Sequence, residues 1–153
     1  MPQKPFPLQK AFLTLAVALL LSPVAGHARD TVHHLDFQSV VNDAIRAGRL
    51  DGSVKFYLKG QKTKGGVVRR FPEAVSNKKT NGVGKSDEEA CAWALQSVLI
   101  AFEANAKKYG ANAVVDLVSF YKRNEYRSST QYECHAGNIM AGVALKGQAA
   151  IVK

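Results

Sequence analysis

Apolar residues recur at helical spacing in two segments of the chain. The first runs from Asp36, an acidic residue suited to cap a helix, to Gly48, which is suited to end one. The second starts at Ser86, which can form a capping box with Glu89, and stops at Gly110. The apolar face of this longer segment contains Cys91, Ala94, Leu95, Val98, Leu99, Phe102, Ala106 and Tyr109. The pattern predicts one short helix and one long helix.

Between these helices, alternating apolar and polar residues predict strands. Ser53–Gly60 alternates with the period of a half-buried strand. A short second strand is predicted at Val67–Phe71, with Pro72 ending it. Glu73–Lys85 has no apolar periodicity, so we predict a polar, mobile loop there.

After the long helix, the chain is rich in apolar and β-branched residues. Ala113–Tyr121 is predicted as a strand, and a polar hairpin loop at Lys122–Ser129 leads to a strand at Thr130–Ala136 that pairs back on it. A last strand is expected at Ile139–Leu145 and resumes at Ala149–Val152. These elements predict an α+β fold, with a small antiparallel sheet covered on one face by one long helix and a short N-terminal helix.

The N-terminus has the three-part layout of a signal peptide. Two lysines precede an apolar run from Ala11 to Leu21, and small residues at Gly26 and Ala28 suit a cleavage site. The apolar run is too short to span a membrane, and no Cys follows it for lipidation. We therefore expect residues 1–28 to be a signal peptide and residues 29–153 a single domain. The expected product is periplasmic or secreted after cleavage near Ala28, without a transmembrane anchor.

Two cysteines, Cys91 and Cys134, remain in this domain. Cys91 lies on the apolar face of the long helix, and Cys134 can point to the sheet face that this helix covers. Because exported proteins fold in an oxidising compartment, we predict a disulfide between them. Two free thiols or a metal site are the alternatives. His135 follows Cys134, but neighbouring side chains of a strand point to opposite faces, so we predict no metal site.

Basic residues are concentrated in one part of the sequence. Loss of Lys4 and Lys10 with the leader leaves 19 basic against 12 acidic residues, a net charge of +7. Nine basic residues, opposed only by Glu73, give one segment a charge of +8: Lys55, Lys59, Lys62, Lys64, Arg69, Arg70, Lys78, Lys79 and Lys85.

Such charge density favours binding to an anionic partner. We expect an exported, non-enzymatic binding or interaction module, with anionic lipid, lipopolysaccharide or an acidic envelope protein as its partner and no role for nucleic acid. A solvated basic face without a dedicated ligand is the alternative. A metal- or redox-responsive envelope sensor using Cys91, Cys134 and His135 is a second functional hypothesis.

The sequence around Lys85 resembles the end of a phosphate-binding loop, since residues 81–86 read Asn-Gly-Val-Gly-Lys-Ser. The full pattern requires glycine at position 79, where this chain has Lys79, and no hydrophobic strand is predicted directly before the loop. Nucleotide hydrolysis is therefore only a remote alternative. The chain has no nucleophile-elbow pattern, and we expect no catalytic residues and no cofactor.

The C-terminal half resembles a known family. The segment Lys107–Val115 and the later Tyr132–Gly137 are similar to the Rcs stress-sensor lipoprotein and to the wider YbjQ-like group of small α/β domains. The chain also resembles small secreted bacterial proteins often labelled "excinuclease ATPase subunit", a label that the sequence Gly84-Lys85-Ser86 would explain.

The resemblance covers residues 86–152 and implies a helix that runs into a strand, with later strands completing a sheet. The sensor lipoprotein has a lipidated Cys at its mature start, where this chain has Arg29. It also has two disulfides, whereas this chain can form one. The resemblance therefore implies the fold but not the signalling role.

Overall fold

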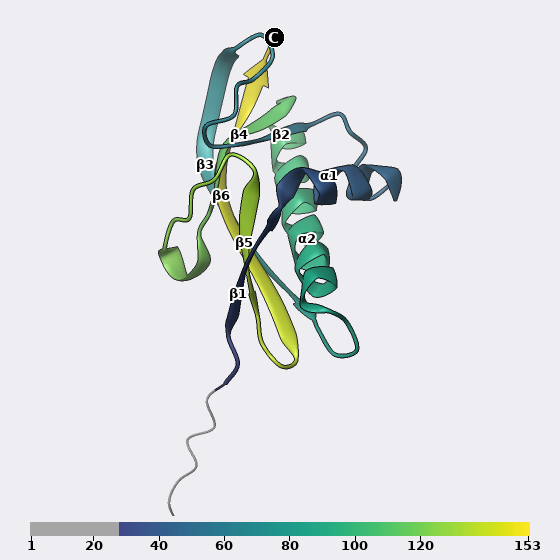
Figure 1. Ribbon diagram of the computed structural model, residues 1–153. Helices are drawn as coiled ribbons and strands as arrows, with labels where there is room; N and C mark the ends of the chain where they lie inside the picture. The colour runs from purple at the N-terminus through teal and green to yellow at the C-terminus, as the bar shows by residue number, and fades with distance from the viewer. Residues whose placement is uncertain (1–27) are drawn as a thin grey trace, which may run out of the picture.

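Six strands form one curled mixed sheet in the computed structural model, which describes residues 28–153 (Figure 1). The predicted signal peptide lies outside the described residues, apart from Ala28. In chain order the elements are β1 (Thr31–Asp36), α1 (Phe37–Arg46), β2 (Lys55–Leu58), β3 (Val67–Asn81), α2 (Asp87–Lys108), β4 (Ala113–Ser119), the 3-10 turn η1 (Tyr121–Arg123), β5 (Gln131–Ala136) and β6 (Met140–Val152). The chain is therefore an α+β protein.

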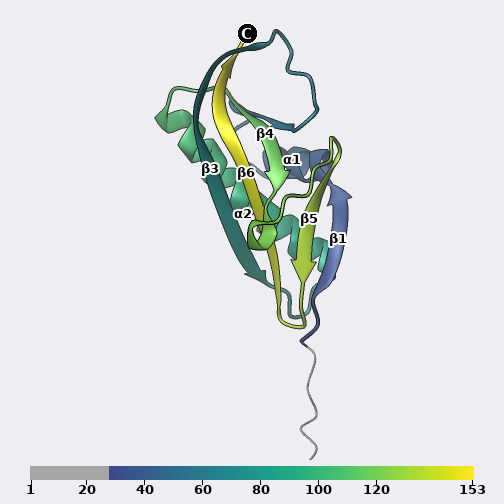
Figure 2. The same cartoon turned by 90° about the vertical axis from the view of Figure 1, so that its left-hand side faces the viewer.

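The long strand β6 organises the sheet (Figure 2). β3 pairs with it along one side, while β4 and β5 pair with successive parts of the other side. β1 pairs with β5, and these four pairings are all antiparallel. β2 instead pairs in parallel with β4, so the predicted antiparallel sheet is in fact mixed. Parallel pairing needs a long crossover connection, and here β3 and α2 both lie between the two strands in sequence.

The prediction for the segment after Phe71 was wrong. β3 does not end at Pro72 and is not followed by a loop, but continues to Asn81, opposite Met140 at the start of β6. Pro72 falls at a register shift between Arg70 and Glu73. Among the described residues, β6 is the only strand that pairs with β3, and most β3 side chains are exposed, so β3 needs no apolar alternation. Proline, lysine and bulges are common on such edge strands.

The pairing of β5 also differs from the prediction. β5 does not pair back on β4, to which the intervening segment is joined only by the bridge between Ser119 and Tyr126. It pairs instead with β6 and with β1, a strand that the sequence analysis missed. β1 contains His33 and His34 and carries no hydrophobic run, so its strand character depends on pairing with β5.

Helix α2 covers one face of the sheet, as predicted (Figure 1). The Ser86 hydroxyl accepts a hydrogen bond from the Glu89 backbone N–H at 3.1 Å, which caps the helix as expected. The predicted apolar face is buried except for Tyr109, which is 38% exposed and stacks on Phe71 of β3. Cys91 of α2 and Cys134 of β5 lie at disulfide distance between the helix and the sheet, with their Cα atoms 5.8 Å apart.

The opposite face of the sheet, here called the open face, has a small apolar cluster of its own near the end of β6. Ala113, Val115, Ala150 and Val152 are buried there. Tyr57 of β2 and Val67 of β3 pack against this cluster and stay partly exposed. Among residues 28–153, no helix is both long enough and apolar enough to cross a membrane.

Candidate anion-binding site

The structure does not gather the nine predicted basic residues on one face. Four of them, Lys62, Lys64, Arg69 and Arg70, lie in the loop before β3 and in the first residues of β3. Lys78, Lys79 and Lys85 lie at the other end of β3 and in the loop that follows it. Lys55 begins β2, where its ammonium donates to the Gly52 carbonyl at 3.1 Å, and Lys59 directly follows the same strand.

The two larger groups are electrostatically separate. Arg70 and Lys79 are nine residues apart on β3, or about 30 Å at the usual rise of a strand. Charges at a surface are screened over about 8 Å at physiological ionic strength. Even the neighbours Lys78 and Lys79 lie on opposite faces of the sheet. Lys78 lies beside Phe102 of α2, whereas Lys79 lies beside Tyr121 and His135 on the open face. Each basic group must therefore be judged by its own surroundings.

Lys62 and Arg70 of the first group border a hollow of about 340 Å³ on the open face, whereas Lys64 and Arg69 lie outside its lining. We call it the basic hollow, and its lining residues are Tyr57, Gln61, Lys62, Thr63, Val67, Arg70, Val115 and Asp116. Three strands and one loop contribute to it: β2, β3, β4 and the loop between β2 and β3. Its apolar surface comes from the small cluster described above, and its polar groups come from the loop and from β3 and β4.

Gln61 holds the loop of the basic hollow in place. Its side-chain oxygen accepts from the Leu58 backbone N–H at 2.8 Å, and its amide donates to the Ser129 carbonyl at 2.8 Å. The far end of the loop is fixed at Gly65, which has a φ of +85°. Gly65 lies so close to the Lys153 backbone that a Cβ at this position would collide with the Lys153 carbonyl. Lys62 and Lys64 therefore project from a loop that is anchored at both ends.

The basic hollow contains unpaired positive charge. The Arg70 guanidinium lies 3.1 Å from a carboxylate oxygen of Asp116, and both side chains are close to half exposed. No hydrogen bond or ion pair with another described residue occupies the ammonium group of Lys62, which lines the hollow, or that of Lys64, which lies two residues further along the same loop. Asp116 is the one acidic residue that lines the hollow, so positive charge exceeds negative charge there.

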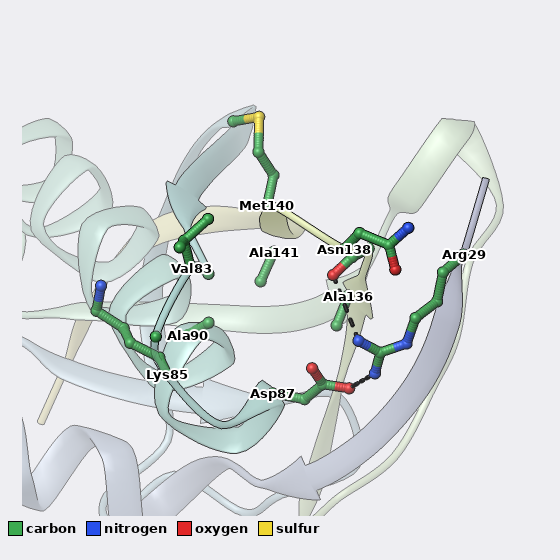
Figure 3. Close-up of a pocket in the computed structure, with 12 residues that line it drawn as sticks. Arg29, Val83, Lys85, Asp87, Ala90, Ala136, Asn138, Met140 and Ala141 are labelled. Carbon is green, nitrogen blue, oxygen red and sulfur yellow. Dashed lines mark hydrogen bonds and ion pairs between the residues drawn. The ribbon is translucent and has the colours of Figure 1, made fainter.

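The other end of the sheet has a second hollow, of about 240 Å³, and its cations are engaged (Figure 3). Arg29 reaches across it to form an ion pair with Asp87, at the start of α2. Lys85 points away from this pair and donates to the Asn81 carbonyl at 3.2 Å. We call this region, with the β5–β6 turn and the loop before α2, the hairpin end.

Carboxylates also hold the three histidines near the hairpin end. His33 lies 2.8 Å from Asp87, and His34 lies 3.4 Å from Glu133. His135 lies 2.9 Å from Asp30 and 3.1 Å from Glu133. The hydrogen bond with His135 lowers the pKa of Asp30, and the hydrogen bond with His33, followed by that with Arg29, lowers the pKa of Asp87. These contacts join β1 to β5 and α2.

The geometry does not bring Cys91, Cys134 and His135 into one ligand set. Both cysteines are fully buried between α2 and the sheet. The His135 ring instead lies on the open face, where it stacks on Tyr121 at a centroid distance of 3.6 Å. Among the described residues, no group of three or more His, Cys, Asp or Glu side chains is arranged to hold a metal ion.

A strand leads directly into the segment that resembles a phosphate-binding loop, because β3 extends to Asn81. It is not the hydrophobic strand of the full pattern, in agreement with the prediction. This strand is a polar edge strand that runs antiparallel to β6, and the Lys85 ammonium bonds to the loop's own backbone. The surroundings thus differ from those of a nucleotide-binding loop, in which a buried parallel strand precedes the lysine.

Lys62 and Arg70 were predicted from the sequence as anion-binding residues, but the other residues of the basic hollow were not. Tyr57 and Val115 lie on strands that were predicted, yet their meeting depends on the parallel pairing of β2 with β4. Asp116 gave one local indication, since it is an acidic residue inside an otherwise apolar run.

Comparison with known proteins yields no similar protein of known role. No protein-family model matches the chain, and no curated protein or solved structure is significantly similar to it.

Proposed function

We propose that this protein is an exported, non-enzymatic binding module of the bacterial envelope that holds an anionic group in the basic hollow. One observation carries the proposal: Lys62 and Arg70 border the same partly apolar hollow, and the Lys62 ammonium is engaged by no other described residue. The leader-like N-terminus and the buried cysteine pair support export. Anionic lipid, lipopolysaccharide or an acidic envelope protein would supply the anionic group.

The surroundings of the basic residues support a binding surface smaller than the whole basic segment. Of the nine basic residues, those at the hairpin end are distant from the basic hollow, and two cations there, Arg29 and Lys85, are already bonded. Lys78 and Lys79 lie on an exposed edge strand, where charged side chains commonly prevent strand-to-strand aggregation. We therefore assign binding to Lys62, Lys64 and Arg70, and a solubilising role to Lys78 and Lys79.

Binding to vesicles that contain phosphatidylglycerol tests the proposal. Each cation near an anionic membrane surface contributes about 1 kcal/mol, so the variant Lys62→Gln/Lys64→Gln should bind about thirtyfold more weakly than the parent protein. The matched variant Lys78→Gln/Lys79→Gln loses the same charge and should bind within about twofold of the parent. Binding should also weaken as salt is raised. Equal losses in the two variants would show that net charge alone drives binding, and no binding at low salt would refute the function.

A further inference from the structure

Asp116 is an unexpected residue in a basic hollow. It lies within β4 at the register shift between Val115 and Val118, with a φ of 55°. This left-handed conformation is unfavourable for most residues, although Asp and Asn adopt it more readily than others. The conformation coincides with the irregularity in the pairing of β4 with β6, and unusual backbone of this kind occurs frequently at ligand sites.

The Asp116 carboxylate remains available to a ligand. Its side chain is 40% exposed, and one oxygen, Oδ2, lies 3.1 Å from Arg70. The other oxygen, Oδ1, accepts no hydrogen bond from a described residue. A purely anionic ligand would gain from Lys62 and Arg70, but the charge of the Asp116 carboxylate would oppose its binding in part.

We propose that the basic hollow recognises a phosphate ester that also carries a primary ammonium group, as in phosphoethanolamine. The phosphate contacts Lys62 and Arg70, and the ammonium contacts Asp116. Tyr57, which lines the same hollow, offers an aromatic face to the cation. This inference rests on the proposed function, because it requires that the basic hollow be the binding site.

The volume of the hollow agrees with a ligand of this size. Sites for drug-sized molecules usually enclose about 300–1,000 Å³, and the basic hollow, at about 340 Å³, is at the lower limit. It therefore suits a headgroup or another small phosphate ester better than a folded protein surface. The zwitterionic chemistry is shared by a phospholipid headgroup and by a free phosphate ester.

The test compares soluble O-phosphoethanolamine with ethyl phosphate, which lacks the ammonium group, by calorimetry or by NMR titration of the mature protein. The parent protein should bind O-phosphoethanolamine about fivefold more tightly, the effect of one exposed ion pair. Asp116→Asn keeps a residue that tolerates the left-handed backbone and should abolish this preference. Asp43→Asn, which removes an exposed carboxylate of α1, is the matched control and should retain it.

Equal affinity of the parent protein for the two compounds, or an unchanged preference in Asp116→Asn, would overturn the inference. Either result would leave the binding of phosphatidylglycerol vesicles through Lys62 and Lys64 unchanged. Failure of the phosphoethanolamine inference is therefore distinguishable from failure of the proposed function. Vesicles with phosphatidylethanolamine in place of phosphatidylcholine distinguish a lipid headgroup from a free phosphate ester as the source of the ligand. Tighter vesicle binding assigns a lipid headgroup, whereas a preference confined to the soluble compounds assigns a free phosphate ester.

Discussion

The two ends of the sheet use basic residues in different ways. At the hairpin end, Arg29 is paired with Asp87 and Lys85 with a carbonyl oxygen, and each of the nearby histidines lies against a carboxylate. Lys79, at the same end, has no ion pair with a described residue and lies beside Tyr121 and His135. At the end where β6 finishes, Lys62 and Lys64 have no such partners among the described residues, and Arg70 has one.

This difference shows why charge counted along the sequence does not locate a binding site. The segment from Lys55 to Lys85 contains nine basic residues and one acidic residue, but the length of β3 distributes these charges over both ends of the sheet. The partners of each cation then decide its role. Paired cations hold elements together, as Arg29 does between the start of the domain and α2, and unpaired cations are free for a ligand.

The largest expected effect comes from removing the buried cysteine pair near the hairpin end. Cys91 and Cys134 are 43 residues apart, and a bond closing such a loop stabilises the folded state by about 4 kcal/mol. The variant Cys91→Ala/Cys134→Ala should lose that much free energy of unfolding in urea. Its remaining folded fraction should still bind anionic vesicles, because neither cysteine lines the basic hollow. A stability equal to that of the parent protein would contradict this role of the cysteine pair.

A smaller effect is expected at Gly147 of β6, opposite the bulge that contains Asp116. A Cβ at this position would lie 2.7 Å from Leu117 Cδ2 and 3.1 Å from the Val115 carbonyl oxygen. Gly147→Ala should therefore destabilise the protein by about 1–3 kcal/mol and also weaken binding at the basic hollow.

Gly142→Ala, on the same strand but nearer the hairpin end, is the control for Gly147→Ala. Its closest contact would be the flexible Lys79 side chain at 3.4 Å, so thermal unfolding should change little. If the two variants were equally unstable, the tight packing at Gly147 would have no special importance.

Acid should weaken the hairpin end through Asp87. Its pKa is lowered in the folded protein, so its contribution to stability is present above the ordinary value of about 3.8 and is lost as the pH falls through the lower, folded-state pKa. Below pH 4, the free energy of unfolding of Asp87→Asn should therefore fall less steeply than that of the parent protein. Denaturant titrations between pH 5 and 2 measure this, and identical slopes would count against the ion pairs with His33 and Arg29.

The smallest effect is expected from the ion pair in the basic hollow. Arg70 and Asp116 are both close to half exposed, and such pairs contribute about 0.2–1 kcal/mol. A double-mutant cycle with Arg70→Gln and Asp116→Asn should give a coupling energy in this range. A coupling well above it would mean that the pair mainly stabilises the fold and is not readily available to a ligand.

The sequence predicted those parts of the fold that depend on local interactions. The start of α2 follows from Ser86 and Glu89, and the buried apolar face follows from helical spacing. β3 could not be predicted beyond Phe71, because an edge strand with exposed side chains has no apolar alternation and Pro72 suggests an end. The parallel pairing of β2 with β4 leaves no local pattern either.

The candidate site was predictable to a similar degree. The density of lysine and arginine indicated which residues could bind an anion, and Lys62 and Arg70 were among them. Their separation from Lys79 depended on the unpredicted half of β3. The role proposed for Asp116 depends on a backbone bulge, which side-chain patterns do not reveal.

An NMR titration of the protein with inorganic phosphate tests the central claim most directly. Backbone amide shifts should change and saturate at residues of the basic hollow, above all Tyr57, Lys62, Arg70 and Asp116, and the changes should shrink in Lys62→Gln/Lys64→Gln. Saturating shifts at residues 82–87 of the hairpin end, or small changes spread over all lysines, would contradict the account.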